Sequence, residues 1–373
     1  MKYHHPLKQI LFQTQRYWDR DESRQAVRQA FAKALLCGTP ALGAEVFASD
    51  NEEKIVGHTC KGSACSSCGY RATVQWQRER WAALPDVPYK GITFTMPDVL
   101  WPLFRDNPRL LNVLPALAAS IMQVWASVRH GVRVAVIAIP HTFNGRLEFN
   151  SHVHTMVTAG GLQSSGRWVS SISYDRTWLL EQWRGGVIKL LRVALQVGKL
   201  KTEMCAVQVE ELLAMQESRW WSIKIQNLGS KEHFLRYAGR YARRPPIAQR
   251  RITYIGDRCV RFCYQDKKLN RRVDVQCSPE EFIDLWAQHV PERYRHAVRS
   301  FGLLGPRAIG RTKAAIFLVL AQKQRPRPKR ISWAVSMKRD FGRYPLIDSK
   351  GMPMKWVRRI QPNLSFHAPL TPV

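Results

Sequence analysis

Apolar residues recur every three or four positions in residues 1–36, and this spacing predicts helices there. The next segment, 37–70, is rich in glycine, cysteine and small residues and has no periodicity. Such a segment is typical of a small loop domain held together by a metal ion. A further helix is predicted over Val74–Leu84, and Pro85 ends its pattern.

From Tyr89 onward, short runs of strand type alternate irregularly with helical patterns. The predicted strands are Gly91–Met96, Val132–Ile139, Leu147–Thr158, 167–173 and Trp220–Gln226, with a hairpin from Arg251–Ile255 and Cys259–Tyr264. The predicted helices are two within Asp98–Arg129, then Asp175–Val197, Lys231–Arg243 and Ser278–Gln288. Because this order has no regular βαβ repeat, it favours an α+β fold with a central antiparallel sheet flanked by helices.

The net charge of the chain indicates which class of molecule it binds. The 373 residues include 58 Lys and Arg but only 28 Asp and Glu, a formal net charge of +30. The longest apolar runs, Val134–Pro140 and Ala314–Ala321, are far shorter than the roughly 18 residues of a spanning helix, so no membrane partner is expected. The N-terminus shows no secretory signal, so we expect a cytoplasmic protein. Its large positive charge makes nucleic acid the first partner to consider.

The pattern divides the chain into three parts. Residues 1–84 form an N-terminal helical and metal-binding domain, residues 85–310 form the α+β domain, and residues 311–373 form a basic extension. We expect this extension to contact phosphates, although a merely solvated tail has the same composition. Gly305–Thr312 resembles a nucleotide-binding loop, but it has arginine in place of the phosphate-binding lysine, so no nucleotide cofactor is expected.

Three of the eight cysteines, Cys60, Cys65 and Cys68, lie within nine residues. Their C-x4-C-x2-C spacing supplies three thiolates in the form of a zinc knuckle. The fourth ligand is Cys37 or His58, and Cys37 is preferred because His58 lies so close in sequence to Cys60 that chelation by both is cramped. Four protein ligands leave no open position on the ion, so the predicted Zn²⁺ is structural.

Two histidines, His152 and His154, lie two positions apart in the predicted strand Leu147–Thr158. Side chains alternate between the faces of a strand, so both imidazoles project from one face and can converge on one divalent ion. Two exposed strand histidines give the same pattern, so this motif is weak when it stands alone.

Two tyrosines, Tyr237 and Tyr241, are one turn apart in the predicted helix Lys231–Arg243 and share a face about 6 Å apart. Two tyrosines at the boundary of a core would explain the spacing equally well. The chemical interpretation is a pair of phenolic nucleophiles, whose poor ionisation is offset by a metal ion and by arginine charge. The surrounding arginines are Arg236, Arg240, Arg243 and Arg244.

These three motifs, in this order, resemble the two-tyrosine HUH transposases of rolling-circle insertion sequences (insertion-sequence family ninety-one). The resemblance spans roughly residues 30–310 and is carried by HTCKGSACSSCG, LPDVPYKGITFTMPDVLWPLF, HTFNGRLEFNSHVHTMVTAGGL, FLRYAGRYARRPPIAQRRITY and EEFIDLWAQHVPERYRHAVRSFGLLGPR. The chain departs from the family where Val46–Asp50 replaces a frequent additional C-x2-C, which argues against a second zinc ion. Ser151 also stands where members often have proline.

The resemblance implies an HUH endonuclease domain in which His152 and His154 hold one Mg²⁺ or Mn²⁺. Tyr237 and Tyr241 are then the nucleophiles, attacking single-stranded DNA at transposon ends and target and leaving a 5′-phosphotyrosine and a free 3′-hydroxyl. It places the protein at a bacterial nucleoid and leaves open an oligomer on DNA. The expected DNA contacts are Arg236, Arg240, Arg243, Arg244, Arg250 and Arg251.

The third ligand of the catalytic ion is open. His141 is preferred because it ends the strand before that of His152, and the intervening hairpin would fold it back. A hydrogen-bonded structural role for His141 is the alternative, and Gln226 and His233 are the other candidates. Glu148 shares the face of His152 but lies about 13 Å away along the strand.

Two other functions share part of this pattern. A rolling-circle replication initiator or relaxase would have the histidine and tyrosine motifs but neither the zinc segment nor the 280–307 block. A non-catalytic zinc-bearing DNA-binding protein would need only the cysteines and the charge.

Overall fold

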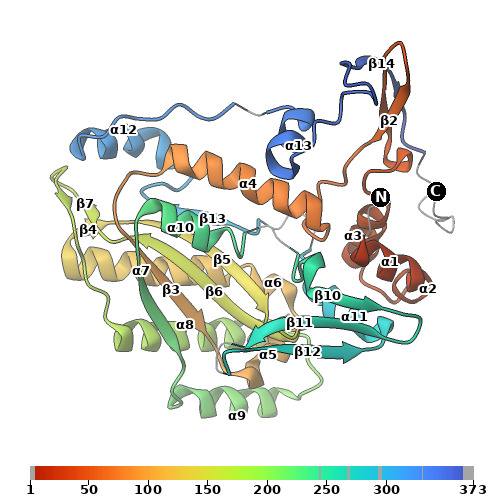
Figure 1. Ribbon diagram of the computed structural model, residues 1–373. Helices are drawn as coiled ribbons and strands as arrows, with labels where there is room; N and C mark the ends of the chain where they lie inside the picture. Colours follow the sequence, from red (N-terminus) through yellow and green to blue (C-terminus); the bar gives the residue numbers. More distant parts are fainter. Residues whose placement is uncertain (1–4, 243–244, 267–268, 293–295, 330, 364–373) are drawn as a thin grey trace.

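The computed structural model describes residues 5–242, 245–266, 269–292, 296–329 and 331–363. A five-stranded sheet lies at its centre, in the order β13-β5-β6-β3-β9, and all its neighbouring strands are antiparallel (Figure 1). The strands are β3 (Tyr89–Thr95), β5 (Ala135–Phe143), β6 (Phe149–Thr158), β9 (Ile223–Gly229) and β13 (Arg299–Gly302). The expected mixture of helices and antiparallel sheet is therefore confirmed.

Alternate residues of the central strands face two different layers of helices. Val136 and Ala138 of β5 pack toward α7 (Leu114–His130) and α8 (Arg176–Gln196), which α9 (Ala206–Glu217) extends. Ile137 and Ile139 face the opposite layer. This second layer contains α4 (Ser66–Ala83), α10 (Lys231–Ala238) and α12 (Ile309–Val319) (Figure 1). The sheet is thus covered on both faces, with the short α5 (Trp101–Arg105) at one end.

One helical stretch, Pro108–His130, is long and apolar enough to cross a membrane by length and composition. It contains α6 (Pro108–Leu111) and α7, and buried residues of α7 belong to the core beneath the central sheet. A core helix of this kind passes the same test, so the stretch is weak evidence for a membrane span.

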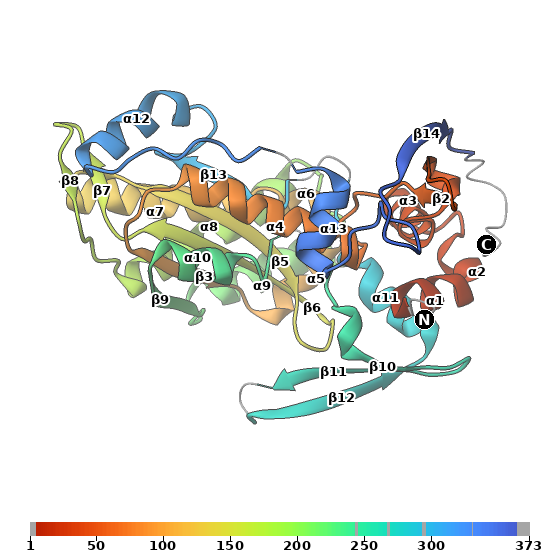
Figure 2. The ribbon, with the colours of Figure 1, turned by 45° about the horizontal axis from the view of Figure 1, so that its top comes forward.

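A second core lies beside the central sheet. It is built on the three-stranded sheet β10 (Ile252–Ile255), β11 (Val260–Asp266) and β12 (Arg271–Cys277), which projects from the body of the protein (Figure 2). One face of this sheet packs against α11 (Pro279–Ala287), α1 (Pro6–Gln13) and α3 (Gln25–Leu35), and the short α2 (Gln15–Trp18) lies between α1 and α3 in the chain. The predicted hairpin is present as β10 and β11, and the prediction missed β12.

The N-terminal and C-terminal segments share a small sheet. β1 (Ala44–Ala48) and β2 (Glu53–Gly57) form a hairpin within the segment predicted to be loop, and β14 (Lys355–Ile360) pairs with β1 on its other side. The basic extension also forms α13 (Trp333–Phe341). Residues 311–363 are therefore not simply a solvated arm where the structure describes them.

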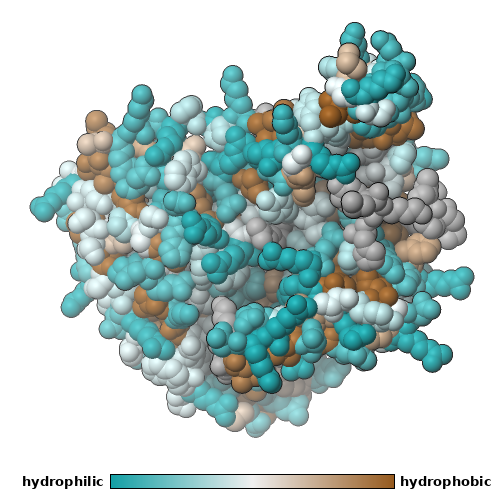
Figure 3. Space-filling view, viewed as in Figure 1, coloured by the Kyte–Doolittle hydropathy of each residue, from teal (hydrophilic) through white to brown (hydrophobic). Residues whose placement is uncertain are grey.

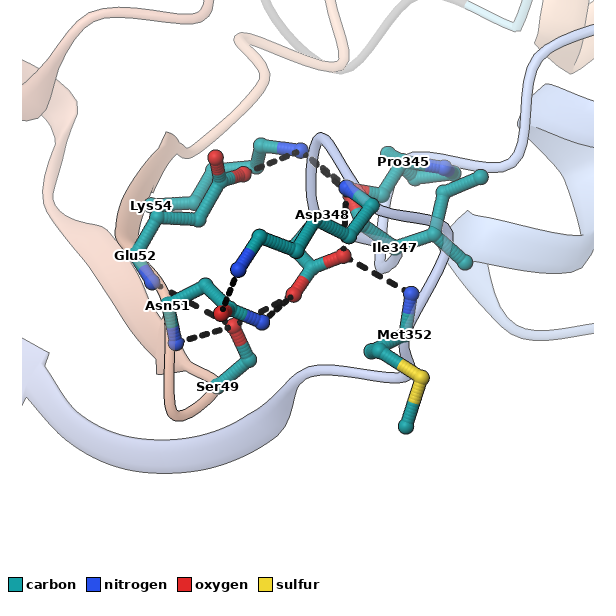
Figure 4. A network of polar contacts seen from close by, with 9 residues as sticks. Ser49, Asn51, Glu52, Lys54, Pro345, Ile347, Asp348 and Met352 are labelled. Carbon is teal, nitrogen blue, oxygen red and sulfur yellow. Dashed lines mark hydrogen bonds and ion pairs between the residues drawn. The ribbon is translucent and has the colours of Figure 1, made fainter.

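Asp348 anchors this extension on the β1–β2 turn (Figure 4). Its carboxylate accepts hydrogen bonds from Ser49 Oγ and Asn51 Nδ2, each at 2.8 Å, and from the backbone N–H of Met352 at 2.7 Å. These bonds, that from Asn51 foremost, lower the pKa of Asp348 to about 2. Lys54 Nζ adds bonds to the carbonyls of Pro345 and Ile347. The turn therefore holds the extension through an ionised carboxylate.

Replacing Asp348 with asparagine is expected to loosen the extension, because the amide lacks the charge and one acceptor oxygen of the carboxylate. Trypsin should then cut within residues 323–359 about tenfold faster, since cleavage follows the population of the open state. The folded pKa lies below the unfolded one, so in the wild type this anchoring is complete above pH 4 and is lost as the pH falls from 4 toward 2. Asp257→Asn in the exposed β10–β11 turn is the control, and equal cleavage of both variants would contradict the anchor.

Several element boundaries differ from the sequence predictions. α4 begins at Ser66 rather than Val74, so the last cysteine of the cluster lies in its first turn. α10 ends at Ala238 rather than Arg243, because Gly239 follows it and glycine is a poor helix former. Only Trp168–Val169 of the strand predicted over 167–173 forms, as β8, which pairs with β7 (Gly161–Gln163) beside β4 (Val132–Arg133).

Candidate active site

Three histidines meet on one face of the central sheet. β5 and β6 are hydrogen-bonded neighbours, and their register places His141 directly opposite His152, with His154 two residues further along β6. His141 Nδ1 lies 3.1 Å from His152 Nε2, and His152 Nε2 lies 3.2 Å from His154 Nε2. The hairpin therefore folds His141 back onto the H-x-H pair.

This arrangement fits a divalent cation. The three ligand nitrogens lie within 4.8 Å of one another. Two ligands at right angles around an ion with bonds of about 2.1 Å would be about 3 Å apart, close to the observed separations. Burial lowers the pKa of His152 to about 4, and burial together with the neighbouring His152 and His154 holds the pKa of His141 well below its usual range. The imidazoles of His141 and His152 are thus neutral at pH 7, the form that binds metal ions.

The two tyrosines lie against this histidine cluster. Tyr237, near the end of α10, has its hydroxyl 3.1 Å from Nδ1 of His154. The ring of Tyr241 stacks on the ring of His154, with centroids 3.8 Å apart and an angle of 22°. The two phenol rings are 5.2 Å apart, so a turn beyond the end of α10 keeps the spacing expected of a helix. Burial, and then the neighbouring Tyr237, raise the pKa of Tyr241 above its ordinary value.

Helix α4 packs on the segment that carries Tyr237 and Tyr241 and fixes its position. Gln77 Nε2 donates to the carbonyl of Leu235 at 2.8 Å, and Thr73 Oγ1 donates to the carbonyl of Ala242. A Cβ at Gly239 would lie 2.3 Å from Gln77 Nε2, so only glycine permits this approach. Helix α10 itself begins at a cap in which Ser230 accepts from the backbone N–H of His233. Contacts from α4 on one side and from His154 on the other therefore hold the segment of the two phenols.

The arginines predicted to bind DNA differ in their surroundings. Arg236, Arg240 and Arg250 are exposed, although Arg236 also pairs with Glu232 at 3.2 Å. Arg251 is half-buried and donates to the carbonyls of Cys263 and Gly145, so its guanidinium joins two parts of the protein. Arg243 and Arg244 lie outside the described residues.

The other candidates for third ligand are not part of the cluster that the described residues form. His233 is exposed on α10, and Glu148 is bonded to Asn144 Nδ2 at 2.8 Å. Gln226 lies on β9, where its side chain packs over Gly91 of β3.

Sequence reasoning missed three residues that position the histidines. The carbonyl of Asn150 accepts from Nδ1 of His152 at 2.8 Å, which turns Nε2 of that ring toward the cluster. Thr93 Oγ1 lies 3.2 Å from Nδ1 of His154. His289 of the segment after α11 contacts Thr142 and the carbonyl of Leu147 and so fixes the β5–β6 turn. Of these three residues, only Asn150 could have been found from the sequence, because it lies two positions before His152 in the same strand.

Four thiols form a separate cluster at the start of α4. The sulfurs of Cys37 and Cys68 lie 3.6 Å apart, those of Cys60 and Cys68 3.6 Å, and those of Cys65 and Cys37 3.7 Å. Sulfurs at the corners of a tetrahedron around a Zn²⁺ ion, each at about 2.3 Å, would be about 3.8 Å apart. The structure therefore groups Cys37, and not His58, with the other three. His58 instead bonds to Glu45 at 3.1 Å.

The close approach of the four thiols shifts their pKa values in opposite directions. Hydrogen bonds from neighbouring thiols, first that of Cys37, lower the pKa of Cys65 to about 7 and that of Cys68 well below its usual value. The same proximity, first to Cys37, raises the pKa of Cys60. Four thiolates this close repel one another unless a cation lies between them, so the cluster supports a structural Zn²⁺.

Comparisons with known proteins agree with this division. Residues 10–96 match a family described as a transposase zinc-binding domain, and residues 135–311 match a family described as a putative transposase. The chain is 31% identical over 306 residues to the transposase for insertion sequence element IS801 of Pseudomonas savastanoi pv. phaseolicola, covering 78% of this chain and 73% of that protein.

It is also similar to the putative transposase y4qJ of Sinorhizobium fredii, with 28% identity over 76% of this chain and 75% of that protein. No solved structure matches the chain significantly. The two matched regions contain, respectively, the four thiols and the histidine and tyrosine cluster.

Proposed function

The chain belongs to the IS91-family transposases with an N-terminal zinc-binding domain, and from this membership we propose that it cuts and rejoins single-stranded DNA through Tyr237 and Tyr241. The observation that carries the proposal is the meeting of three histidine nitrogens with two phenols. Tyr237 contacts His154, and Tyr241 stacks on it, so a phosphate bound at the histidines would lie beside both nucleophiles.

His141, His152 and His154 would hold a Mg²⁺ or Mn²⁺ ion. When bound, such an ion polarises the phosphate and offsets the charge that develops on it. If Nε2 of His154 binds the ion, its Nδ1 would carry the ring proton and could donate to the phenolic oxygen of Tyr237. That hydrogen bond favours the ionised phenol, which is the attacking form.

In the proposed reaction, the tyrosine oxygen attacks the phosphorus and the bond from phosphorus to the 3′-oxygen breaks. The phenol proton is replaced by the phosphoryl group, and the departing 3′-oxygen gains a proton as a hydroxyl. The 5′-phosphate stays on the tyrosine. A second 3′-hydroxyl reverses the step and releases the tyrosine, so the exchange of one phosphodiester for another needs no external energy source.

Two phenols at one site suit strand transfer. While one tyrosine holds a 5′-end, the other remains to cut a second strand before the first is resealed. Their rings are 5.2 Å apart and both contact His154, so either could reach a phosphate held there.

Positive charge supports DNA as the partner. Arg236, Arg240 and Arg250 are exposed on the segments that carry or follow the tyrosines, and the chain as a whole has a net charge of +30. Hydrophilic side chains cover much of the face shown in Figure 3, with apolar groups in small separate patches. The net positive charge attracts the phosphate backbone whatever its sequence.

The test is metal-dependent cleavage of a single-stranded oligonucleotide that carries the element's end. With Mn²⁺ and a 3′-labelled strand, the wild type should form a labelled adduct that survives SDS, whereas a 5′-labelled strand should release a shorter free fragment. His141→Ala should lower adduct formation by about a hundredfold, because the ion loses one of three protein ligands.

His233→Ala is the matched control, since this exposed histidine lies on the tyrosine helix. If the His233 variant loses activity while the His141 variant keeps it, the ligand assignment is wrong. A wild type that binds the strand but never forms the adduct would leave only a zinc-bearing DNA-binding protein.

A further inference from the structure

We propose that the outer face of the β10–β12 sheet is a second binding surface for single-stranded DNA, with Tyr254 and Arg261 as its centre. The outer face is defined by Tyr254, Arg261 and Gln276, which are register partners across the three strands, and by Gln265 and Arg272, which lie two rows further along, beyond Cys263 and Asp274. The proposal rests on the proposed function, because it concerns the strand that the histidine and tyrosine site would process.

The two faces of this sheet are unlike. Val260 and Phe262 of β11 are fully buried against α11 and the N-terminal helices. Arg261 lies between them in the strand and therefore points to the other side, where it is exposed. Tyr254 on that side is 47% exposed. One face of the sheet is thus packed against the protein, and the other face is exposed to solvent.

Tyr254 and Arg261 form a preassembled stacking pair. The guanidinium carbon of Arg261 lies 4.7 Å from the centroid of the Tyr254 ring. Aromatic rings and guanidinium planes are the two platforms on which proteins stack unpaired bases. Bases in a duplex are already stacked on each other, so this pair favours a single strand over a duplex.

The charge of the surface suits a phosphate backbone. Arg258 in the β10–β11 turn and Arg250 before β10 are exposed and add to Arg261 and Arg272. The acidic residues are Asp257 in the turn and Asp274, which lies 3.8 Å from Arg272. Among these described residues, four arginines therefore outnumber two carboxylates, and Arg261 forms an ion pair with neither carboxylate.

The sheet that carries this surface contacts the β5–β6 turn, which is part of the proposed active site. Arg251 joins the carbonyl of Cys263 in β11 to that of Gly145 in the β5–β6 turn, and the ring of Tyr264 packs on Gly145. That turn connects the strand of His141 to the strand of His152. A strand whose phosphate lies at the histidines could therefore continue onto the β10–β12 sheet.

The test is binding of fluorescent dT20 by the full chain, measured by anisotropy without added divalent ion. Tyr254→Ala with Arg261→Ala should weaken binding about tenfold or more, in line with the loss of a stacked base and a phosphate contact. Tyr254→Phe, which keeps the ring, should bind nearly as the wild type does. Arg129→Ala is the charge control: Arg129 is exposed at the end of α7, at the opposite end of β5 from His141. It should bind nearly as the wild type does.

A second readout identifies the contact directly. Light-induced cross-linking of dT20 that carries 5-iododeoxyuridine should modify a peptide containing Tyr254. Unchanged dT20 affinity of the double variant, or an equal loss with a 20-base-pair duplex, would overturn the proposal. Because no cleavage is involved, a wild type that fails to form the covalent adduct yet binds dT20 through Tyr254 would disprove the proposed chemistry and keep the surface.

Discussion

Replacement of both Tyr237 and Tyr241 with phenylalanine is expected to abolish the covalent protein–DNA adduct, a loss of at least about a thousandfold. Phenylalanine keeps both rings, so the stack of residue 241 on His154 and the histidine cluster should persist. Only the two oxygens that can accept a phosphoryl group are removed. The measurement is the SDS-resistant complex formed with Mn²⁺ and a 3′-labelled single strand.

The single variants divide the roles of the two phenols. Either Tyr237→Phe or Tyr241→Phe should keep some adduct, because the remaining phenol contacts the same histidine. Each should lose strand transfer between two oligonucleotides, which needs both phenols. Tyr344→Phe, an exposed tyrosine of the C-terminal extension, is the matched control. A double variant with wild-type adduct would remove the mechanism, and dT20 binding by that variant would show that it is folded.

The site could be predicted from the sequence where the spacing was local. His152 and His154 share a strand, and Tyr237 and Tyr241 share a turn, so period and spacing alone bring each pair together. The meeting of His141 with His152 could not be predicted from spacing within one strand, because it depends on the register of β5 against β6. The short turn between these strands restricts that register, which is why the hairpin favoured His141 over its alternatives.

Contacts between distant segments could not be predicted in this way. β14 pairs with β1 across about 300 residues of chain, and nothing in its exposed, charged sequence indicates a partner. The burial of Arg251 has the same cause, since its two carbonyl partners lie on separate hairpins. The early start of α4 was missed because its first turn, Ser66–Gly69, consists of two serines, a cysteine and a glycine and has no helical periodicity.

Helix α4 links the four-cysteine cluster to the segment that carries Tyr237 and Tyr241. Its N-terminus carries Cys65 and Cys68, and its body donates from Thr73 and Gln77 to the backbone around the tyrosines. Figure 1 shows α4 running from the zinc-binding region across α10. The four thiols therefore set the orientation of this helix at its N-terminus, and the middle of the helix holds the segment of Tyr237 and Tyr241.

This linkage predicts that Cys65→Ser with Cys68→Ser will lose about one zinc ion per chain and most of the adduct-forming activity. Serine does not replace a thiolate ligand, and structural zinc sites contribute on the order of 10 kcal/mol to the folding of their domains. The first turn of α4 should then lose its anchor, although every histidine and tyrosine of the site is intact. The measurements are zinc content by atomic emission, trypsin cleavage within residues 37–70, and adduct yield.

Cys205→Ser with Cys259→Ser is the matched control, because it also removes two thiols but neither belongs to the four-sulfur cluster. Cys205 caps α9, a position that serine occupies well, so this variant should keep its zinc and its activity. Retention of zinc by the Cys65 and Cys68 variant would refute the ligand set. Loss of zinc with full adduct yield would instead show that α4 keeps its position without the ion, because α10 and Ser66, which bonds to Gln249, would then suffice to hold it.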